Sequence, residues 1–230
     1  MRIKPTMIGF DADDTLFVNE TYFLEAEHLF CELMLPFAEK ATTAQTIYQT
    51  QIDNLSQYGY GIKGYILSMM EAGLQLSNHQ ISPKEMAEII LIGKNLLNKP
   101  IVLLDQVEET LATLSEKYKL IVVTKGDLKD QHRKLHHSGL GKYFHHIEVL
   151  SDKQVEDYQK LFNRLEIKPE DFLMVGNSLK SDVLPVLELG GNAIHIPFHT
   201  TWLHEQIDFE LTHDNFRALR NIAEVKDFLV

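Results

Sequence analysis

Cysteine is almost absent from this sequence, and so are long hydrophobic runs. The single cysteine, Cys31, excludes a disulfide within the chain and suits a reducing compartment. No stretch approaches the roughly 18 consecutive apolar residues of a membrane-spanning helix. Charged residues and a proline precede the first apolar stretch, which argues against a signal peptide. These absences predict a cytoplasmic protein that does not enter a membrane.

Basic residues are also in deficit. Lys and Arg number 22 against 33 Asp and Glu, which gives a net charge of −11. Partners that are nucleic acid polymers or anionic membranes need a basic surface, so neither is expected. A small phosphorylated ligand stays compatible with this charge, because a bound cation reverses the field at one site.

An acidic cluster stands out near the N-terminus. The stretch MIGFDADDTLF, residues 7–17, places three aspartates within four positions directly after an apolar run. Like charges repel, and a buried carboxylate is costly unless it is paired or bound to a cation. An ordinary Asp-rich turn is the alternative, since aspartate favours turns and helix caps. The rest of the chain has to decide between the two.

Strand and helix patterns alternate along most of the remaining chain. Short apolar runs typical of buried strands occur at residues 7–10, 120–124, 147–150, 172–175 and 193–196. This alternation predicts an α/β fold with a parallel, three-layer Rossmann-like sheet core. Residues 18–98 show only helical spacing. We therefore expect a core of residues 1–17 and 99–230, with residues 18–98 inserted as an all-helical domain.

Three helix starts are expected from capping residues. Ser82 is followed by a proline and, at the third position, by Glu85, which is the order of a capping box. Asn19 is placed to cap the first helix, and Asp105 with Glu108 to cap the helix that follows the insertion.

Polar groups follow four of the expected strands. They are Asp11–Thr15, Thr124–Gly126, Ser151–Lys153, and Gly176–Ser178 with Asp182. The carboxyl ends of parallel strands share one edge of a sheet, so these groups should converge there. Clustered oxygen ligands suit Mg²⁺, and a hydroxyl, backbone N–H groups and a lysine suit a phosphoryl group. A carboxylate beside both can act as a nucleophile.

The same stretches resemble, in order, the four motifs of the haloacid dehalogenase-like hydrolase superfamily. MIGFDADDTL is similar to its Asp-x-Asp-x-Thr motif, and LIVVTKG to its second motif, a strand that ends in Thr or Ser. The lysine of LSDKQVEDY resembles the third motif, and FLMVGNSLKSD the fourth. The helical insertion between the first two motifs resembles that of the helical-cap (C1) subclass.

The resemblance implies a role for each acidic position. Asp11 would be the nucleophile and a Mg²⁺ ligand. Asp13 would be the general acid and then the general base, and would bind the metal through its backbone carbonyl. Asp182 would be a further metal ligand. Asn177 stands where an aspartate is more common, so one negative charge is missing and Asp182 is the favoured ligand of the two.

The remaining motif residues would handle the phosphoryl group. The resemblance implies that Thr124 and the backbone N–H of Lys125 hold its oxygens, and that Lys153 neutralises the transferred group. An acid at Asp13 is typical of the phosphatases, because an alkoxide leaving group needs a proton. The chain therefore resembles a Mg²⁺-dependent phosphatase that acts on a small phosphorylated metabolite through an aspartyl-phosphate.

Alternatives remain at this stage. A phosphomutase or a dehalogenase-like member would use the same nucleophile. A phospho-receiver also combines an acidic pair, a phosphorylated aspartate and a lysine, but in receivers no large insertion interrupts the fold. A binding protein without catalytic activity is a further alternative. Residues 59–64 match G-x-G-x-x-G without the strand that a nucleotide loop requires. We expect a cap loop there, with Lys63 either touching substrate or simply solvated.

Overall fold

A single parallel sheet forms the centre of the computed structural model, which describes residues 5–229. Within these residues the spatial order of the six strands is β3-β2-β1-β4-β5-β6. The strands are β1 (Met7–Phe10), β2 (Lys119–Lys125), β3 (His146–Leu150), β4 (Phe172–Gly176), β5 (Asn192–His195) and β6 (Phe216–Ala218). From β1 the chain builds outward through β2 and β3, then returns to the other side of β1 as β4. Ligands of open α/β sheets bind beside such a reversal of strand order.

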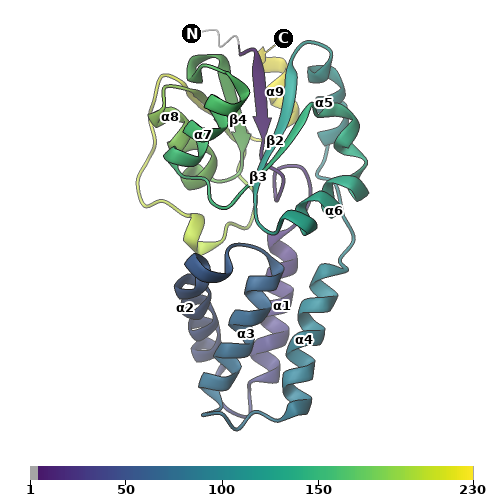
Figure 1. Ribbon diagram of the computed structural model, residues 1–230, viewed down its shortest axis with the longest axis vertical. Coiled ribbons are helices and arrows are strands. Elements are labelled where there is room, and N and C mark those ends of the chain that lie inside the picture. The colour runs from purple at the N-terminus through teal and green to yellow at the C-terminus, as the bar shows by residue number, and fades with distance from the viewer. Residues whose placement is uncertain (1–4, 230) are drawn as a thin grey trace. The chain divides into compact units, whose positions relative to one another are not determined.

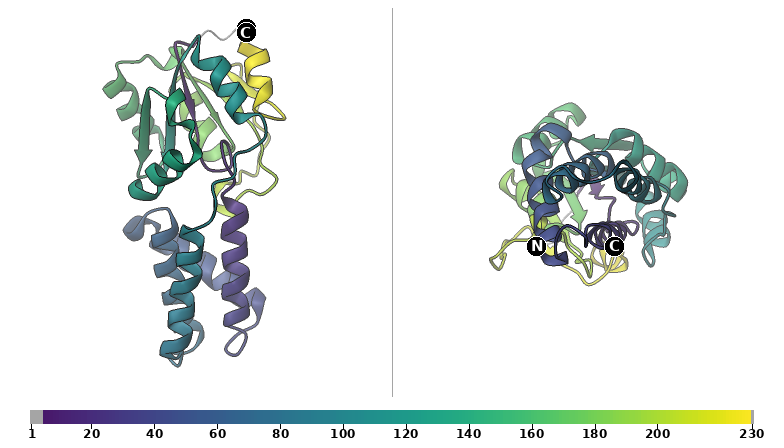
Figure 2. Two further views of the ribbon diagram at one scale, coloured as in Figure 1. Left: turned by 90° about the vertical axis from the view of Figure 1, so that its right-hand side faces the viewer. Right: turned by 90° about the horizontal axis from the view of Figure 1, so that it is seen from below.

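Helices cover both faces of this sheet (Figures 1 and 2). One face carries α5 (Val107–Ser115), α6 (Leu128–Ser138) and α9 (Ala223–Leu229), and the other carries α7 (Val155–Leu165) and α8 (Leu184–Glu188). The apolar run of β2 packs against the helices on both faces. Leu120 and Val122 belong to one buried cluster, and Ile121 and Val123 belong to the other. The predicted three-layer α/β core is confirmed. β6 escaped prediction, because three residues are too few to show a period.

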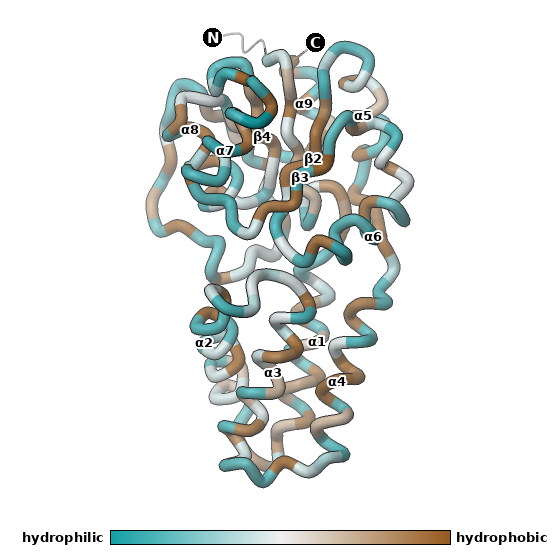
Figure 3. Tube along the Cα trace, in the orientation of Figure 1, coloured by the Kyte–Doolittle hydropathy of each residue, from teal (hydrophilic) through white to brown (hydrophobic). Residues whose placement is uncertain are grey.

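Four helices occupy the stretch that shows only helical spacing. They are α1 (Glu20–Leu33), α2 (Lys40–Tyr58), α3 (Ile62–Leu76) and α4 (Pro83–Leu97). Hydrophobic and hydrophilic residues alternate along them (Figure 3). The apolar sides meet in a buried cluster of their own, built around Phe30, Met34, Ile47, Met69 and Ile89. No helix among residues 5–229 combines the length and apolar character needed to cross a membrane.

The chain divides into two compact units. One consists of Met1–Glu20, Ile101–Lys125 and Gln131–Val230, and contains the sheet. The other consists of Thr21–Pro100 together with Gly126–Asp130. Each unit has its own hydrophobic core.

Only one of the three expected helix caps has the predicted hydrogen bonds. The backbone N–H of Glu85 donates to Ser82 Oγ at 3.2 Å, and that of Ser82 donates to Glu85 Oε2 at 2.7 Å, so α4 begins with a capping box. The cap predicted at Asp105 is wrong, because α5 begins after Gln106, which adopts a left-handed φ of 60° and makes no side-chain cap. Asn19 directly precedes α1, but another residue, described below, supplies the cap.

Helices α3 and α4 approach closely at Gly93. A Cβ atom there would lie 2.0 Å from Cγ1 of Ile66. We expect Gly93→Ala to lower the free energy of unfolding by about 1–2 kcal/mol, since the clash exceeds the gain in helix propensity. Urea unfolding followed by circular dichroism measures this. Gly141→Ala is the matched control, because nothing lies within 4 Å of a Cβ at Gly141. An equal effect of both substitutions would contradict the close packing.

Candidate active site

Asp11 lies at the end of the central strand. Its backbone N–H donates to the carbonyl of Val175 at 2.9 Å, which extends the pairing of β1 with β4 by one residue. The chain then turns sharply, and the N–H of Leu16 donates back to the carbonyl of Ala12 at 2.9 Å. This turn directs the Asp11 side chain to the carboxyl edge of the sheet, beside the reversal of strand order.

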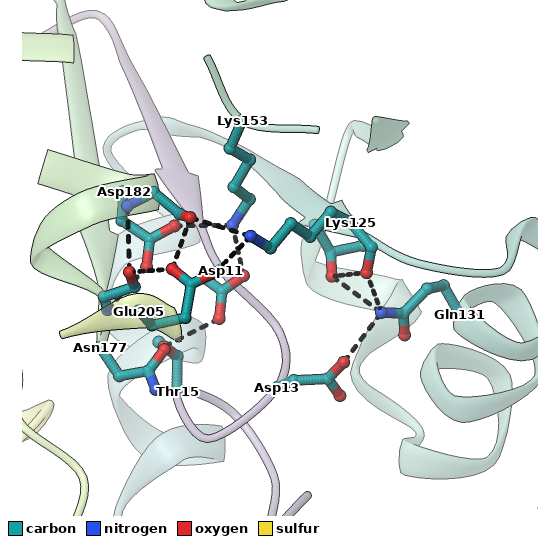
Figure 4. Close-up of polar contacts among 12 residues, drawn as sticks. Asp11, Asp13, Thr15, Lys125, Gln131, Lys153, Asn177, Asp182 and Glu205 are labelled. Carbon is teal, nitrogen blue, oxygen red and sulfur yellow. Dashed lines mark hydrogen bonds and ion pairs between the residues drawn. The ribbon is translucent and has the colours of Figure 1, made fainter. Parts of the chain in front are cut away.

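A buried lysine links Asp11 to a second carboxylate. Lys153, on the loop after β3, is 2% exposed, and its Nζ lies 2.5 Å from Asp11 Oδ1 and 2.6 Å from Asp182 Oδ1. Asp182 belongs to a π-helical turn, Leu179–Val183, that follows β4. Figure 4 shows the three side chains converging from three segments of the chain. π-Helical turns are frequent at functional sites.

Burial and the neighbouring charges shift the pKa values of Asp11 and Lys153. Burial raises the pKa of Asp11 to about 7, although the ammonium of Lys153 acts to lower it. Burial acts to lower the pKa of Lys153, but Asp11 and Asp182 outweigh it and raise that pKa well above its usual value. Lys153 therefore stays charged, and any additional cation at this edge would favour the ionised form of Asp11.

Thr15 connects Asn177 to Asp11. Thr15 Oγ1 donates to Asp11 Oδ2 at 3.2 Å and lies 3.4 Å from Asn177 Oδ1. The backbone carbonyl of Asn177 is 2.9 Å from Nε2 of His195, on β5. Burial lowers the pKa of His195, so the neutral ring donates this hydrogen bond and holds the loop after β4 in place.

The carboxylate of Asp182 packs closely against the backbone of Gly176 and Ser178. A Cβ atom on Gly176 would lie 2.2 Å from Asp182 Oδ2, and the N–H of Ser178 donates to that oxygen at 3.0 Å. Among residues 5–229 no group of three or more His, Cys, Asp or Glu side chains is arranged to hold a metal ion. The oxygen donors gathered here are instead two carboxylates and the amide of Asn177. Such hard donors, completed by a backbone carbonyl and water, fit Mg²⁺.

The side chain of Asp13 points away from Asp11 and toward α6 (Figure 4). Gln131 Nε2 donates to Asp13 Oδ2 at 2.8 Å and to Thr124 Oγ1 at 3.0 Å. Lys134 Nζ lies 2.5 Å from Asp13 Oδ1. The structure thus joins Asp13 and Thr124 through a glutamine. Sequence reasoning missed both Gln131 and Lys134, and the only signal was their three-residue spacing on one helix.

Lys125 is engaged by a carboxylate from a distant segment. Its Nζ lies 2.5 Å from Oε1 of Glu205, and Glu205 Oε2 accepts from the hydroxyls of Ser178 and Ser181, each at 2.5 Å. Burial acts to raise the pKa of Glu205, but Lys125 and the hydrogen bonds outweigh it and lower the pKa to about 2. Glu205 was also missed, because its short helical turn, Leu203–Glu205, lies in a long stretch without periodicity.

The third aspartate of the cluster has a structural task. Asp14 adopts a left-handed φ of 62°, and its carboxylate accepts hydrogen bonds from the backbone N–H groups of Asn19 and Glu20 at 2.8 and 2.9 Å. It therefore caps α1 in place of Asn19. Burial raises the pKa of Asp14 to about 8.

A solved relative shares this fold along nearly the whole chain. The haloacid dehalogenase-like family hydrolase of Xanthomonas campestris superposes with a TM-score of 0.87 at 32% identity, covering 97% of this chain and 91% of that one. Residues 6–190 match the haloacid dehalogenase-like hydrolase family. The chain belongs to this family. It is therefore a hydrolase of the haloacid dehalogenase-like type, as the motifs predicted.

Two curated relatives of this haloacid dehalogenase-like hydrolase are named as phosphatases. Glyceraldehyde 3-phosphate phosphatase of Methanothermobacter thermautotrophicus is 24% identical over 233 residues, which cover 96% of this chain and 98% of that protein. N-acylneuraminate-9-phosphatase of Mus musculus is 25% identical over 130 residues. That second match spans 54% of this chain and only 50% of the mouse protein.

Proposed function

We propose that this hydrolase is a Mg²⁺-dependent phosphatase that cleaves small organic phosphate monoesters through an aspartyl-phosphate at Asp11. The observation that carries the proposal is the contact of the buried Lys153 with both Asp11 and Asp182 at the reversal of strand order. Its two relatives named as phosphatases support the reaction class. The net charge of −11 suits a small metabolite better than a nucleic acid polymer, and the buried Cys31 suits the reducing cytoplasm.

The reaction proceeds in two steps. An oxygen of Asp11 attacks phosphorus while the bond to the leaving oxygen breaks, and that oxygen takes the proton of Asp13. In the second step Asp13 takes a proton from water, and the water oxygen attacks the phosphorus. The bond between phosphorus and the Asp11 oxygen breaks, which frees the Asp11 carboxylate and forms inorganic phosphate. Thr124 Oγ1 and the backbone N–H of Lys125 hold the transferred oxygens. Lys153 offsets the negative charge that gathers on them.

The metal would be held by oxygen atoms alone. Asp11, Asp182, the backbone carbonyl of Asp13 and the amide of Asn177 are the ligands we assign, with Asp182 as the main partner of Asp11. When bound, Mg²⁺ supplies positive charge that offsets the repulsion between the carboxylates and the anionic substrate.

The inserted helices would select the substrate. We assign residues 18–98 as a cap that excludes water during the reaction and contacts the part of the substrate that leaves. Lys63 is one candidate contact, although within its own unit its Nζ is already paired with Asp127 Oδ2 at 2.9 Å.

Metal-dependent phosphate release tests the proposal directly. We expect the protein to release inorganic phosphate from p-nitrophenyl phosphate and from members of a panel of metabolite phosphates with Mg²⁺, and to lose at least about 100-fold in rate with EDTA. Adding Mg²⁺ back should restore the rate. Turnover that is unchanged by EDTA contradicts the metal assignment, and accumulation of a phosphorylated isomer instead of phosphate indicates a phosphomutase.

A further inference from the structure

Two buried polar side chains of α6 hold both oxygens of Asp13. Lys134 contacts Oδ1 and Gln131 contacts Oδ2, at 2.5 and 2.8 Å. Lys134 is 7% exposed and Gln131 is 2% exposed. Neither residue belongs to the four motifs, and nothing in the proposed function gives either of them a task.

Burying Lys134 is costly for the fold. A lysine taken out of water loses its hydration, and a buried ion pair is often no more stabilising than apolar residues of similar volume. The other contacts of Lys134 are with uncharged groups and are longer. Its Nζ lies 3.3 Å from Asn19 Oδ1 and 5.6 Å from the centre of the Phe17 ring. Asp13 is therefore the partner that explains the position of Lys134.

Gln131 connects the acid to the phosphoryl-binding groups. Its Nε2 contacts three acceptors, which are Asp13 Oδ2, Thr124 Oγ1 at 3.0 Å and the carbonyl of Lys125 at 2.7 Å. Because all three are acceptors, the orientation of the amide is fixed. Its Oε1 is buried and without a hydrogen-bond partner among the described residues. Thr124 Oγ1 accepts from Gln131 and donates to the carbonyl of Lys125 at 3.4 Å, so these two partners together orient the hydroxyl.

We infer that Gln131 and Lys134 are positioning residues for leaving-group protonation, because they hold the Asp13 carboxyl at a fixed place relative to Thr124. This inference rests on the proposed phosphatase function. The proton of Asp13 moves to the leaving oxygen as the P–O bond breaks, and the ammonium of Lys134 stabilises the carboxylate that remains. Both side chains contact Asp13 rather than Asp11, so the attack by Asp11 does not depend on them directly.

The inference predicts a loss that depends on the leaving group. Nitrophenolate leaves well without a proton, whereas phenolate needs one far more. General acid catalysis contributes about 10²–10⁴-fold. We expect Lys134→Met and Gln131→Leu to lower kcat for phenyl phosphate by about 100-fold, but kcat for p-nitrophenyl phosphate by less than about 5-fold. Across a series of substituted phenyl phosphates, the rate should fall more steeply with leaving-group basicity in these variants than in the wild-type protein.

Three further variants complete the test. Lys142→Met is the matched control, because Lys142 is an exposed lysine of the same unit that pairs with Glu108. Lys134→Arg keeps the charge and should recover part of the rate on phenyl phosphate. Asp13→Asn should show the same selective loss, and adding Lys134→Met to it should cost little more, since the two changes remove one function.

The outcomes separate this inference from the function on which it rests. Equal losses on both esters, or full additivity with Asp13→Asn, overturn the positioning role while the phosphatase stands. A wild-type protein that releases no phosphate overturns both. If Lys134→Met does not fold, Gln131→Leu and Lys134→Arg are measured on both esters in its place. A loss on phenyl phosphate alone that is larger in Gln131→Leu than in Lys134→Arg supports the positioning role, and equal losses on both esters overturn it.

Discussion

Asp11→Asn is expected to reduce phosphate release by about 1,000-fold or more, because an amide is a poor nucleophile and cannot form the aspartyl-phosphate. The change is nearly isosteric, and Lys153 keeps its contact with Asp182 at 2.6 Å. The fold should therefore persist. Phosphate release and circular dichroism of the same sample test both statements.

An exposed aspartate provides the control for this substitution. Asp105 lies outside the site at the surface, so Asp105→Asn should leave turnover within about twofold of wild type. In the wild-type protein, rapid quenching during turnover should trap phosphate bound to Asp11, detectable by mass spectrometry. Unreduced turnover in Asp11→Asn would show that another group is the nucleophile.

Lys153→Met is expected to damage stability and activity together. It removes the ammonium that lies 2.5 and 2.6 Å from Asp11 and Asp182, and leaves two buried carboxylates without a counter-charge. Breaking a buried ion pair in this way costs about 3–5 kcal/mol. Activity should fall by about 100-fold or more, since one preorganised charge beside the transferred group is lost.

Thermal unfolding with and without Mg²⁺ measures the stability part. Mg²⁺ should restore part of the lost Tm in Lys153→Met, because a cation held by these carboxylates would supply positive charge in place of the lysine. Adding Asp11→Asn should also restore stability, since it removes one of the repelling charges. Lys160→Met is the control, because that side chain is 74% exposed and should change Tm little. Equal Tm values for both lysine variants would refute the electrostatic account.

Local patterns explain the parts of the fold that could be predicted. The apolar run of β2 and the capping box at Ser82 each depend on neighbours within a few residues of the chain. The predicted cap at Asp105 failed because the backbone takes a left-handed turn at Gln106, which changes where α5 begins. Asp14 was read with the acidic cluster, yet its partners are the N–H groups five and six residues later.

The sequence by itself determined the architecture and the loops from which the candidate site residues come. Strand ends in a parallel sheet share one edge, so Asp11, Thr124, Lys153 and Asp182 could be placed there from their order alone.

Tertiary structure alone decided which polar groups touch. Gln131 and Lys134 come to Asp13 across 118 and 121 positions of sequence, and Glu205 reaches Lys125 across 80. No local periodicity records such contacts, because they depend on how a helix or loop packs over the sheet edge. Burial then makes each of these pairings matter, since a polar group removed from water must find its partner within the fold.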